Sequence, residues 1–97
     1  METVDLIEQL MKEKLGANHV RIIDESHLHR GHKVAGGGGH YNLTVVSKQF
    51  ENQSPLDTRR MVYQALDEQI NGTPKLIHAL QIKTLTPEQW GKMAKSN

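Results

Sequence analysis

The stretch YNLTVVS, residues 41–47, decides the fold because its alternating pattern fixes a strand in the middle of the chain. Large apolar side chains occupy every second position from Tyr41 to Val45, and this alternation predicts a half-buried β-strand. A β-branched segment, HVRIIDES at residues 19–26, precedes it and also predicts a strand. Because consecutive strands usually pair, we expect an antiparallel hairpin. The connection between the strands is long, which is typical of a functional or disordered loop.

One helix is predicted before this hairpin and another after it. The first covers residues 3–15, with Thr3 as the expected N-cap and Gly16 as the expected stop. The second covers residues 54–71 and begins at Ser54, whose hydroxyl suits an N-cap position just before a proline. Both segments repeat apolar residues at helical spacing, so each is expected to turn one face toward a shared core.

The last third of the chain predicts a strand and a closing helix. The strand is KLIHALQIKTLT, residues 75–86, and a short helical turn over residues 75–78 is an alternative start for it. Thr86 and Gln89 have the spacing of a capping box, which predicts a helix directly after the strand. The residues of this helix expected to face inward are Trp90, Met93 and Ala94.

This order of elements predicts an α+β fold. The chain of 97 residues has the length of one domain, spanning residues 1–97. We expect a small α-β-β-α-(α)-β-α domain with a three-stranded mixed sheet and helices packed on one face.

Composition excludes several classes of function. The chain has no cysteine, so it forms no disulfide, thiolate nucleophile or all-cysteine metal site by itself. A formal net charge of +1 is too close to neutral to indicate a polyanionic partner. No apolar run approaches the roughly 18 residues of a membrane span. The first residues carry acids rather than a basic signal region. We therefore expect no membrane association and a cytoplasmic protein, or a mitochondrial or plastid one whose transit peptide has been removed.

The sequence also gives no support for an enzyme. It has no nucleophile elbow, and its paired carboxylates, Asp24-Glu25 and Asp67-Glu68, are neighbours whose side chains diverge. The glycine run over residues 36–39 lacks the Gly-Lys-Ser/Thr ending of a phosphate-binding loop, so we interpret it as a flexible connection.

Histidines are the most distinctive feature. Four of the six fall within HLHRGHKVAGGGGHY, residues 27–41, but their gaps match no paired zinc-ligand pattern. The alternative to metal ligation is that these histidines are simply exposed to solvent on the loop. His78 stands apart, between two apolar residues, and from spacing alone it is a partly buried histidine bonded to a backbone carbonyl. Arg59 and Arg60 on the second helix suit either phosphate contacts or a solvated helix face.

Four segments together resemble the BolA family: DESHLHRGH, HYNLTVVSKQF, RRMVYQAL and IHALQIKTLTPEQW. The resemblance runs from Val4 to Trp90. It implies a fold similar to the type II KH domain and a non-enzymatic protein that is a monomer on its own. It also implies a heterodimer with a monothiol glutaredoxin that holds a [2Fe-2S] cluster, with thiolates from the glutaredoxin and glutathione and histidine from the BolA-like chain. The implied role is cluster trafficking and iron homeostasis; some bacterial members are also assigned DNA-binding regulation linked to morphology and stress.

The resemblance assigns site residues by position. His78 matches the family histidine before Ala-Leu and is the expected first ligand. The second is expected in the loop between the first two strands, where His32 is the first choice, His29 the second and His40 the third. If DNA is bound, Arg59 and Arg60 are the expected contacts, although Thr58-Arg59-Arg60 replaces the Arg-His-Arg that many members carry.

Overall fold

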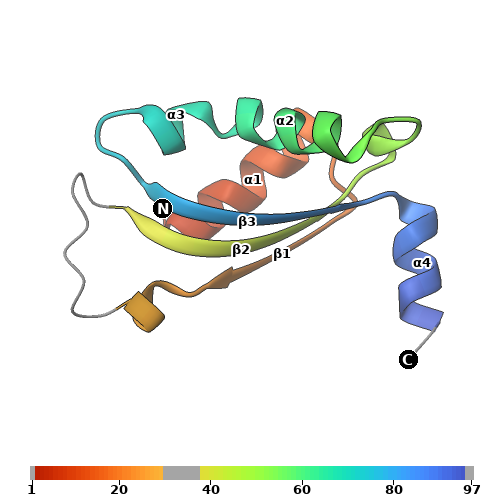
Figure 1. Cartoon of the computed structure of the whole chain (residues 1–97), viewed down its shortest axis with the longest axis horizontal. Coiled ribbons are helices and arrows are strands. Elements are labelled where there is room, and N and C mark those ends of the chain that lie inside the picture. The colour runs from red at the N-terminus through yellow and green to blue at the C-terminus, as the bar shows by residue number, and fades with distance from the viewer. Residues whose placement is uncertain (1, 30–37, 96–97) are drawn as a thin grey trace.

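The computed structural model describes residues 2–29 and 38–95 (Figure 1). No helix in these two ranges is long and apolar enough to cross a membrane. The elements in chain order are α1 (Thr3–Leu15), β1 (His19–Asp24), the 3-10 turn η1 (Ser26–His29), β2 (Gly39–Val46), the 3-10 turn η2 (Lys48–Phe50), α2 (Pro55–Ala65), α3 (Asp67–Asn71), β3 (Ile77–Leu85) and α4 (Pro87–Lys95).

The sheet is mixed and has the order β1-β2-β3. β1 and β2 pair antiparallel, which confirms the predicted hairpin, and β3 lies parallel to β2. Parallel neighbours need a crossover, which α2 and α3 supply. α1, α2 and α3 cover one face of the sheet, while α4 stands at the end where β3 finishes (Figure 1). The parallel pairing has a direct consequence for the site, because β2 and β3 begin at the same end of the molecule.

The core lies between the sheet and the helices. Leu43 and Val45 of β2 are fully buried, and so are Ile7 and Met11 of α1. The alternating apolar residues of β2 and the helically spaced apolar residues of α1 therefore pack in the same core, as the sequence predicts. The remaining buried members of this cluster are Leu15, Tyr41, Phe50, Val62, Ala65, Leu66 and Ile77.

Two predicted helix starts are confirmed in detail. The Ser54 hydroxyl accepts a hydrogen bond from the backbone N–H of Asp57 over 3.1 Å, which caps α2. At α4 the bonds are reciprocal: the backbone N–H of Thr86 donates to Oε1 of Gln89 at 2.8 Å, and the Gln89 N–H donates to the Thr86 hydroxyl at 3.2 Å. These bonds satisfy backbone donors that have no partner within the helix.

Three local predictions are wrong. Thr3 is the first helical residue of α1 rather than its cap, and Glu2 occupies the N-cap position without a side-chain bond. The helix predicted over residues 54–71 is broken at Leu66, whose φ of −110° and ψ of 17° leave the helical region while its side chain is fully buried. No helical turn forms over residues 75–78, because Leu76 already accepts a backbone hydrogen bond from Gly39, at the start of β2.

The last helix packs on the sheet less completely than its sequence predicts. Trp90 is half-buried and stacks on the ring of His19, with 4.5 Å between centroids and 22° between planes. Met93 is 38% exposed, so the prediction that it faces inward is wrong. The reason is that α4 projects beyond the end of the sheet (Figure 1). The side chain of Ala94 lies outside the described part of the molecule.

Candidate functional site

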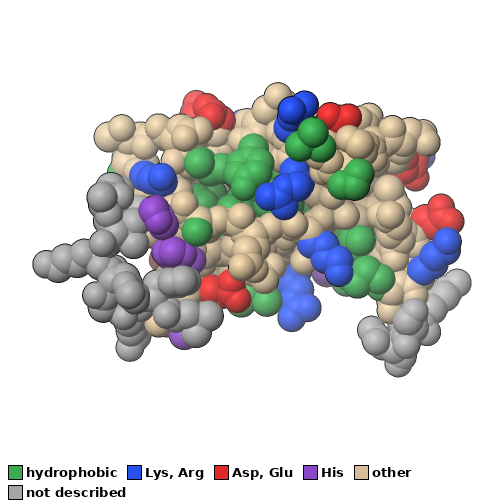
Figure 2. Space-filling model, in the orientation of Figure 1, with side chains coloured by type: hydrophobic (Ala, Val, Ile, Leu, Met, Phe, Trp, Pro, Cys, Tyr) green, Lys and Arg blue, Asp and Glu red, His purple; other side chains and the backbone are tan. Residues whose placement is uncertain are grey.

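The fold brings together two histidines that are far apart in sequence. His40 lies near the start of β2 and pairs with Ala79, the neighbour of His78 on β3. The ring centroids of His40 and His78 are 5.2 Å apart, with 55° between the ring planes. Figure 2 shows histidine side chains gathered at this end of the sheet. We refer to His40 and His78 as the histidine pair.

A β-bulge determines how His78 is presented. Gly39 pairs with Ile77 while the next residue, His40, pairs with Ala79, so His78 is an extra residue on β3. An extra residue changes the phase of a strand and redirects its side chains. Accordingly Ile77 is 1% exposed, whereas His78 and Ala79 are both exposed. The prediction of a partly buried His78 is therefore wrong, because spacing alone does not reveal the bulge.

Two glycines allow the backbones to meet at this point. Gly38 has a φ of +95°, and a Cβ placed on it would lie 2.9 Å from the backbone nitrogen of His78. A Cβ on Gly39 would lie 2.7 Å from the Tyr41 hydroxyl and 2.8 Å from the Ser26 hydroxyl. Glycine is required at Gly38, where a Cβ would meet main-chain atoms, whereas a Cβ at Gly39 would press on the side chains of Tyr41 and Ser26. The interpretation of the glycine run as a flexible connection is thus incomplete, and residues 36 and 37 lie outside the described range.

The residues that follow β1 hold the start of β2 on the side opposite to β3. The backbone N–H of His40 donates to the Ser26 hydroxyl at 3.0 Å, and its carbonyl accepts from the Glu25 N–H at 2.8 Å. The Ser26 N–H donates to Asp24 at 2.9 Å. Hydrogen bonds from the Ser26 side chain and backbone, helped by nearby His27, hold the pKa of the Asp24 carboxyl below its usual value. Sequence reasoning missed this role, although Asp followed two residues later by Ser is a turn signal.

A hollow of about 290 Å³ opens beside the histidine pair. It is bordered by His40, by a carboxylate from Glu25 and by an amide from Gln81, which itself accepts a hydrogen bond from Asn42 over 3.2 Å. Tyr41 also borders it, and burial raises the pKa of the Tyr41 phenol, which belongs to the core. The hollow gives room for a further chemical group next to the rings.

The loop histidines contribute less to the described geometry. His32 lies outside the described residues, and so does the side chain of His29, whose backbone ends η1. Of the three loop candidates, His40 is therefore the one that the structure places beside His78. The ranking of His32 and His29 above it stays a prediction.

The two arginines lie on a different element. The Arg59 guanidinium sits over the Tyr63 ring, 5.9 Å from its centroid. Arg60 forms a long ion pair with Asp57 at 3.9 Å, in which both side chains are more than half exposed. Exposed pairs of this kind contribute little to stability. Arg59 and Arg60 are both exposed on α2, so both guanidinium groups are accessible to a partner.

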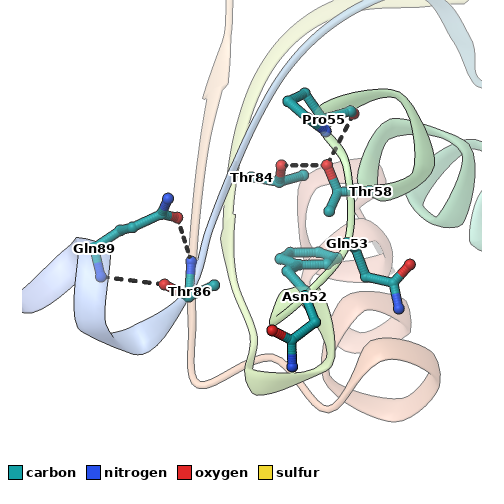
Figure 3. Close-up of a pocket in the computed structure, with 8 residues that line it drawn as sticks. Asn52, Gln53, Pro55, Thr58, Thr84, Thr86 and Gln89 are labelled. Carbon is teal, nitrogen blue, oxygen red and sulfur yellow. Dashed lines mark hydrogen bonds between the residues drawn. The ribbon is translucent and has the colours of Figure 1, made fainter.

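A second cavity lies at the other end of β3, where α2 and α4 begin (Figure 3). Its volume is about 210 Å³ and the residues lining it are uncharged. The Thr58 hydroxyl donates to the carbonyl of Pro55 at 2.9 Å, and it lies 2.7 Å from the Thr84 hydroxyl (Figure 3). The two hydroxyls satisfy one another and join α2 to β3 at this cavity.

The chemistry of the histidine pair is that of metal ligands. Imidazole binds iron, zinc, copper and nickel. Within the described residues no group of three or more histidines, cysteines, aspartates or glutamates is arranged around one point. A metal or cluster at the pair therefore takes its remaining donors from water or from a partner, and because the chain lacks cysteine any thiolate comes from a partner. The exposed His78 at a strand edge fits such shared ligation.

Fold and site define a small α+β protein that presents a histidine pair at the start of two parallel strands. The family model described as BolA-like protein matches residues 11–89, and the chain belongs to this family. It is 33% identical over 90 residues to the DNA-binding transcriptional regulator BolA of Haemophilus influenzae, covering 93% of this chain and 82% of that protein. It is 38% identical over 92 residues to Protein BOLA2 of Arabidopsis thaliana, covering 93% and 85%.

The solved structures agree with this assignment. BolA1 from Arabidopsis thaliana superposes with a TM-score of 0.76 at 27% identity, over 91% of this chain and 95% of that one. The α+β fold with a mixed three-stranded sheet, expected from the sequence, is confirmed.

Proposed function

We propose that the protein is a non-enzymatic BolA-like partner of a monothiol glutaredoxin, with which it shares a [2Fe-2S] cluster for iron–sulfur trafficking and iron homeostasis. The observation that carries this proposal is the exposed His78, which a bulge redirects to the surface beside His40. A purely structural histidine at a strand start has no need of a bulge that exposes it. The protein acts as one half of a heterodimer and is a monomer on its own.

The ligands divide between the partners according to their chemistry. This chain supplies imidazole from His78, with His32 as the first choice for the second ligand, then His29 and His40. The glutaredoxin and its glutathione supply the thiolates that this chain lacks. When bound, a cluster with histidine ligands has a higher reduction potential than an all-cysteine one, as in Rieske centres. The chain's own contribution is to hold an imidazole at a fixed position on the sheet.

Anaerobic reconstitution tests the proposal. The chain is mixed with a monothiol glutaredoxin, glutathione, iron and sulfide, and visible absorption and circular dichroism are recorded. We expect a spectrum distinct from that of the glutaredoxin homodimer. The variant His78→Ala should lose it, whereas His19→Gln, which alters an imidazole at the opposite end of the sheet, should keep it.

A mixture whose spectrum equals that of the glutaredoxin homodimer would exclude cluster sharing. The same reconstitution identifies the loop ligand: if His32→Ala and His29→Ala each leave the heterodimer spectrum unchanged, neither of those two loop residues is a ligand.

DNA binding is the second candidate, because a relative 33% identical to this chain is named a DNA-binding transcriptional regulator. The exposed Arg59 and Arg60 on α2 are the groups that would contact phosphates. Binding through phosphates weakens steeply with salt. A titration of duplex DNA at several salt concentrations should show that dependence, and replacing both arginines with alanine should reduce the slope. Binding that is independent of salt, or unchanged in the double variant, would rule out this surface.

A further inference from the structure

The histidine pair has a geometry that a single metal ion would fit without any partner protein. We infer that His40 and His78 together bind one divalent transition-metal ion of the zinc and cobalt type in the chain alone. The inference shares His78 with the proposed function, but it concerns a mononuclear ion and requires neither glutaredoxin nor sulfide.

The separation of the rings is the first argument. An imidazole bound to a tetrahedral ion places its nitrogen about 2.0–2.1 Å from the metal and its ring centroid about 1 Å further away. At a tetrahedral angle of about 109°, two such rings have centroids about 5 Å apart. The centroids of His40 and His78 are 5.2 Å apart. Their planes are tilted by 55°, which differs from a face-to-face stack whose in-plane nitrogen lone pairs run parallel and never converge.

The rigidity of the two backbones is the second argument. His40 is fixed on both sides, by its hydrogen bonds to the β1 end and by its pairing with Ala79. His78 is fixed by the bulge and by the close backbone approach of Gly38. Ligands held on strands need little reordering when they bind a metal, which favours a stable site.

The surroundings determine what kind of ion is accepted. Two neutral imidazoles suit zinc, cobalt, nickel and copper, whereas calcium and magnesium prefer oxygen ligands. The described residues supply two ligands and no cluster of three, so the remaining positions are open to water. The hollow of about 290 Å³ beside His40 has room for those waters. An open metal site of this kind also accepts an incoming ligand from another molecule.

Local spacing in the sequence does not predict that these two histidines meet. The gaps between the loop histidines match no zinc pattern, and His78 is distant from them in the chain. The parallel pairing of β2 with β3 creates the proximity. The site is therefore a product of topology rather than of a local motif.

Titration of the purified chain with Co²⁺, without glutaredoxin or glutathione, tests the inference. We expect the visible ligand-field absorption of a tetrahedral Co²⁺ complex at one ion per chain, displaced by Zn²⁺. The variants His78→Gln and His40→Gln should each weaken binding at least tenfold, since even an outer-shell change costs roughly 10–100-fold in metal affinity. Because His78 is exposed, its replacement tests ligation without disturbing the core.

Controls separate this site from the remaining histidines. A variant with His27, His29 and His32 all changed to glutamine should keep the Co²⁺ spectrum, and so should His19→Gln. Loss of binding in the triple variant, or unchanged binding in His40→Gln, would overturn the inference. A glutaredoxin complex that forms its cluster normally while the chain alone binds no Co²⁺ would overturn the ion site and leave the proposed function intact.

Discussion

At the scale of single residues, glycine and histidine have complementary roles at the candidate site. Gly38 has a left-handed backbone and lies close to the backbone of His78. The absence of a side chain at Gly38 therefore allows the position that His78 takes. Any side chain at this position meets main-chain atoms, which cannot move aside as the end of a flexible side chain can. The position of His78 thus depends on a residue with no functional group of its own.

The substitution Gly38→Ala should destabilise the protein by about 1–3 kcal/mol, because it combines backbone strain with a steric clash. Gly91→Ala is the matched control, since a Cβ there meets no atom within 4 Å and the residue lies inside α4. Alanine in a helix interior should raise stability by about 0.5–1 kcal/mol. Urea unfolding followed by circular dichroism measures both, and equal effects of the two variants would contradict the role given to Gly38.

At the scale of elements, the sequence predicts the three strands and two of the three helix N-caps. The alternation around Leu43 and the capping residues Ser54 and Thr86 are local signals that tertiary structure reinforces. The break at Leu66 has no such local signal: the residue leaves the helical region while its side chain is fully buried in the core. The bulge at His78 depends on a partner strand and is equally invisible in a local pattern.

The candidate site was predictable in the same uneven way. The family resemblance assigns His78, whereas its spacing alone favours a partly buried residue. The proximity of His40 follows from the strand register. Asp24 accepts a hydrogen bond from Ser26, and Ser26 in turn holds the backbone of His40. The turn itself is local in sequence, but its contact with His40 exists only once β1 and β2 are paired.

The stability of the protein should depend on acid pH through Asp24, at the end of β1. Its folded-state pKa is lowered, so its contribution to stability is present above the unfolded value of about 3.9 and is lost as pH falls through the folded value. The variant Asp24→Asn should be less stable than the parent at neutral pH, and the difference should vanish in acid. Urea midpoints measured from neutral pH down to about pH 2, below the unfolded value of about 3.9, check this. Parallel curves for the two proteins would contradict it.

At the scale of the whole molecule, the margin of stability is narrow because a chain of 97 residues buries a modest core. Leu43 occupies the middle of that core on the central strand and is fully buried. Residues from the helices and from the sheet surround it, so its loss is felt by several elements at once. A domain of this size has a total stability of about 5–15 kcal/mol, against which one cavity is a large change.

The substitution Leu43→Ala should cost about 2–5 kcal/mol, because it removes buried methyl groups and leaves a cavity. Leu56→Ala is the control of the same chemistry, and since Leu56 is 58% exposed its effect should stay within about 0.5 kcal/mol. Thermal and urea unfolding of both variants measure these changes in the free energy of unfolding. A small effect at Leu43 would mean that the core repacks around the missing side chain.

The parallel pairing of β2 and β3 also sets the time at which the histidine pair exists. All of α2 and α3 lies between His40 and His78 in the chain, so the rings meet only after the crossover has formed and β3 has docked on the sheet. Contacts between residues this far apart are among the slow steps of folding. During synthesis, a nascent chain that has not yet released β3 carries His40 without its neighbour. Metal captured by the pair is thus a chemical record that the crossover has formed and that β3 has joined the sheet.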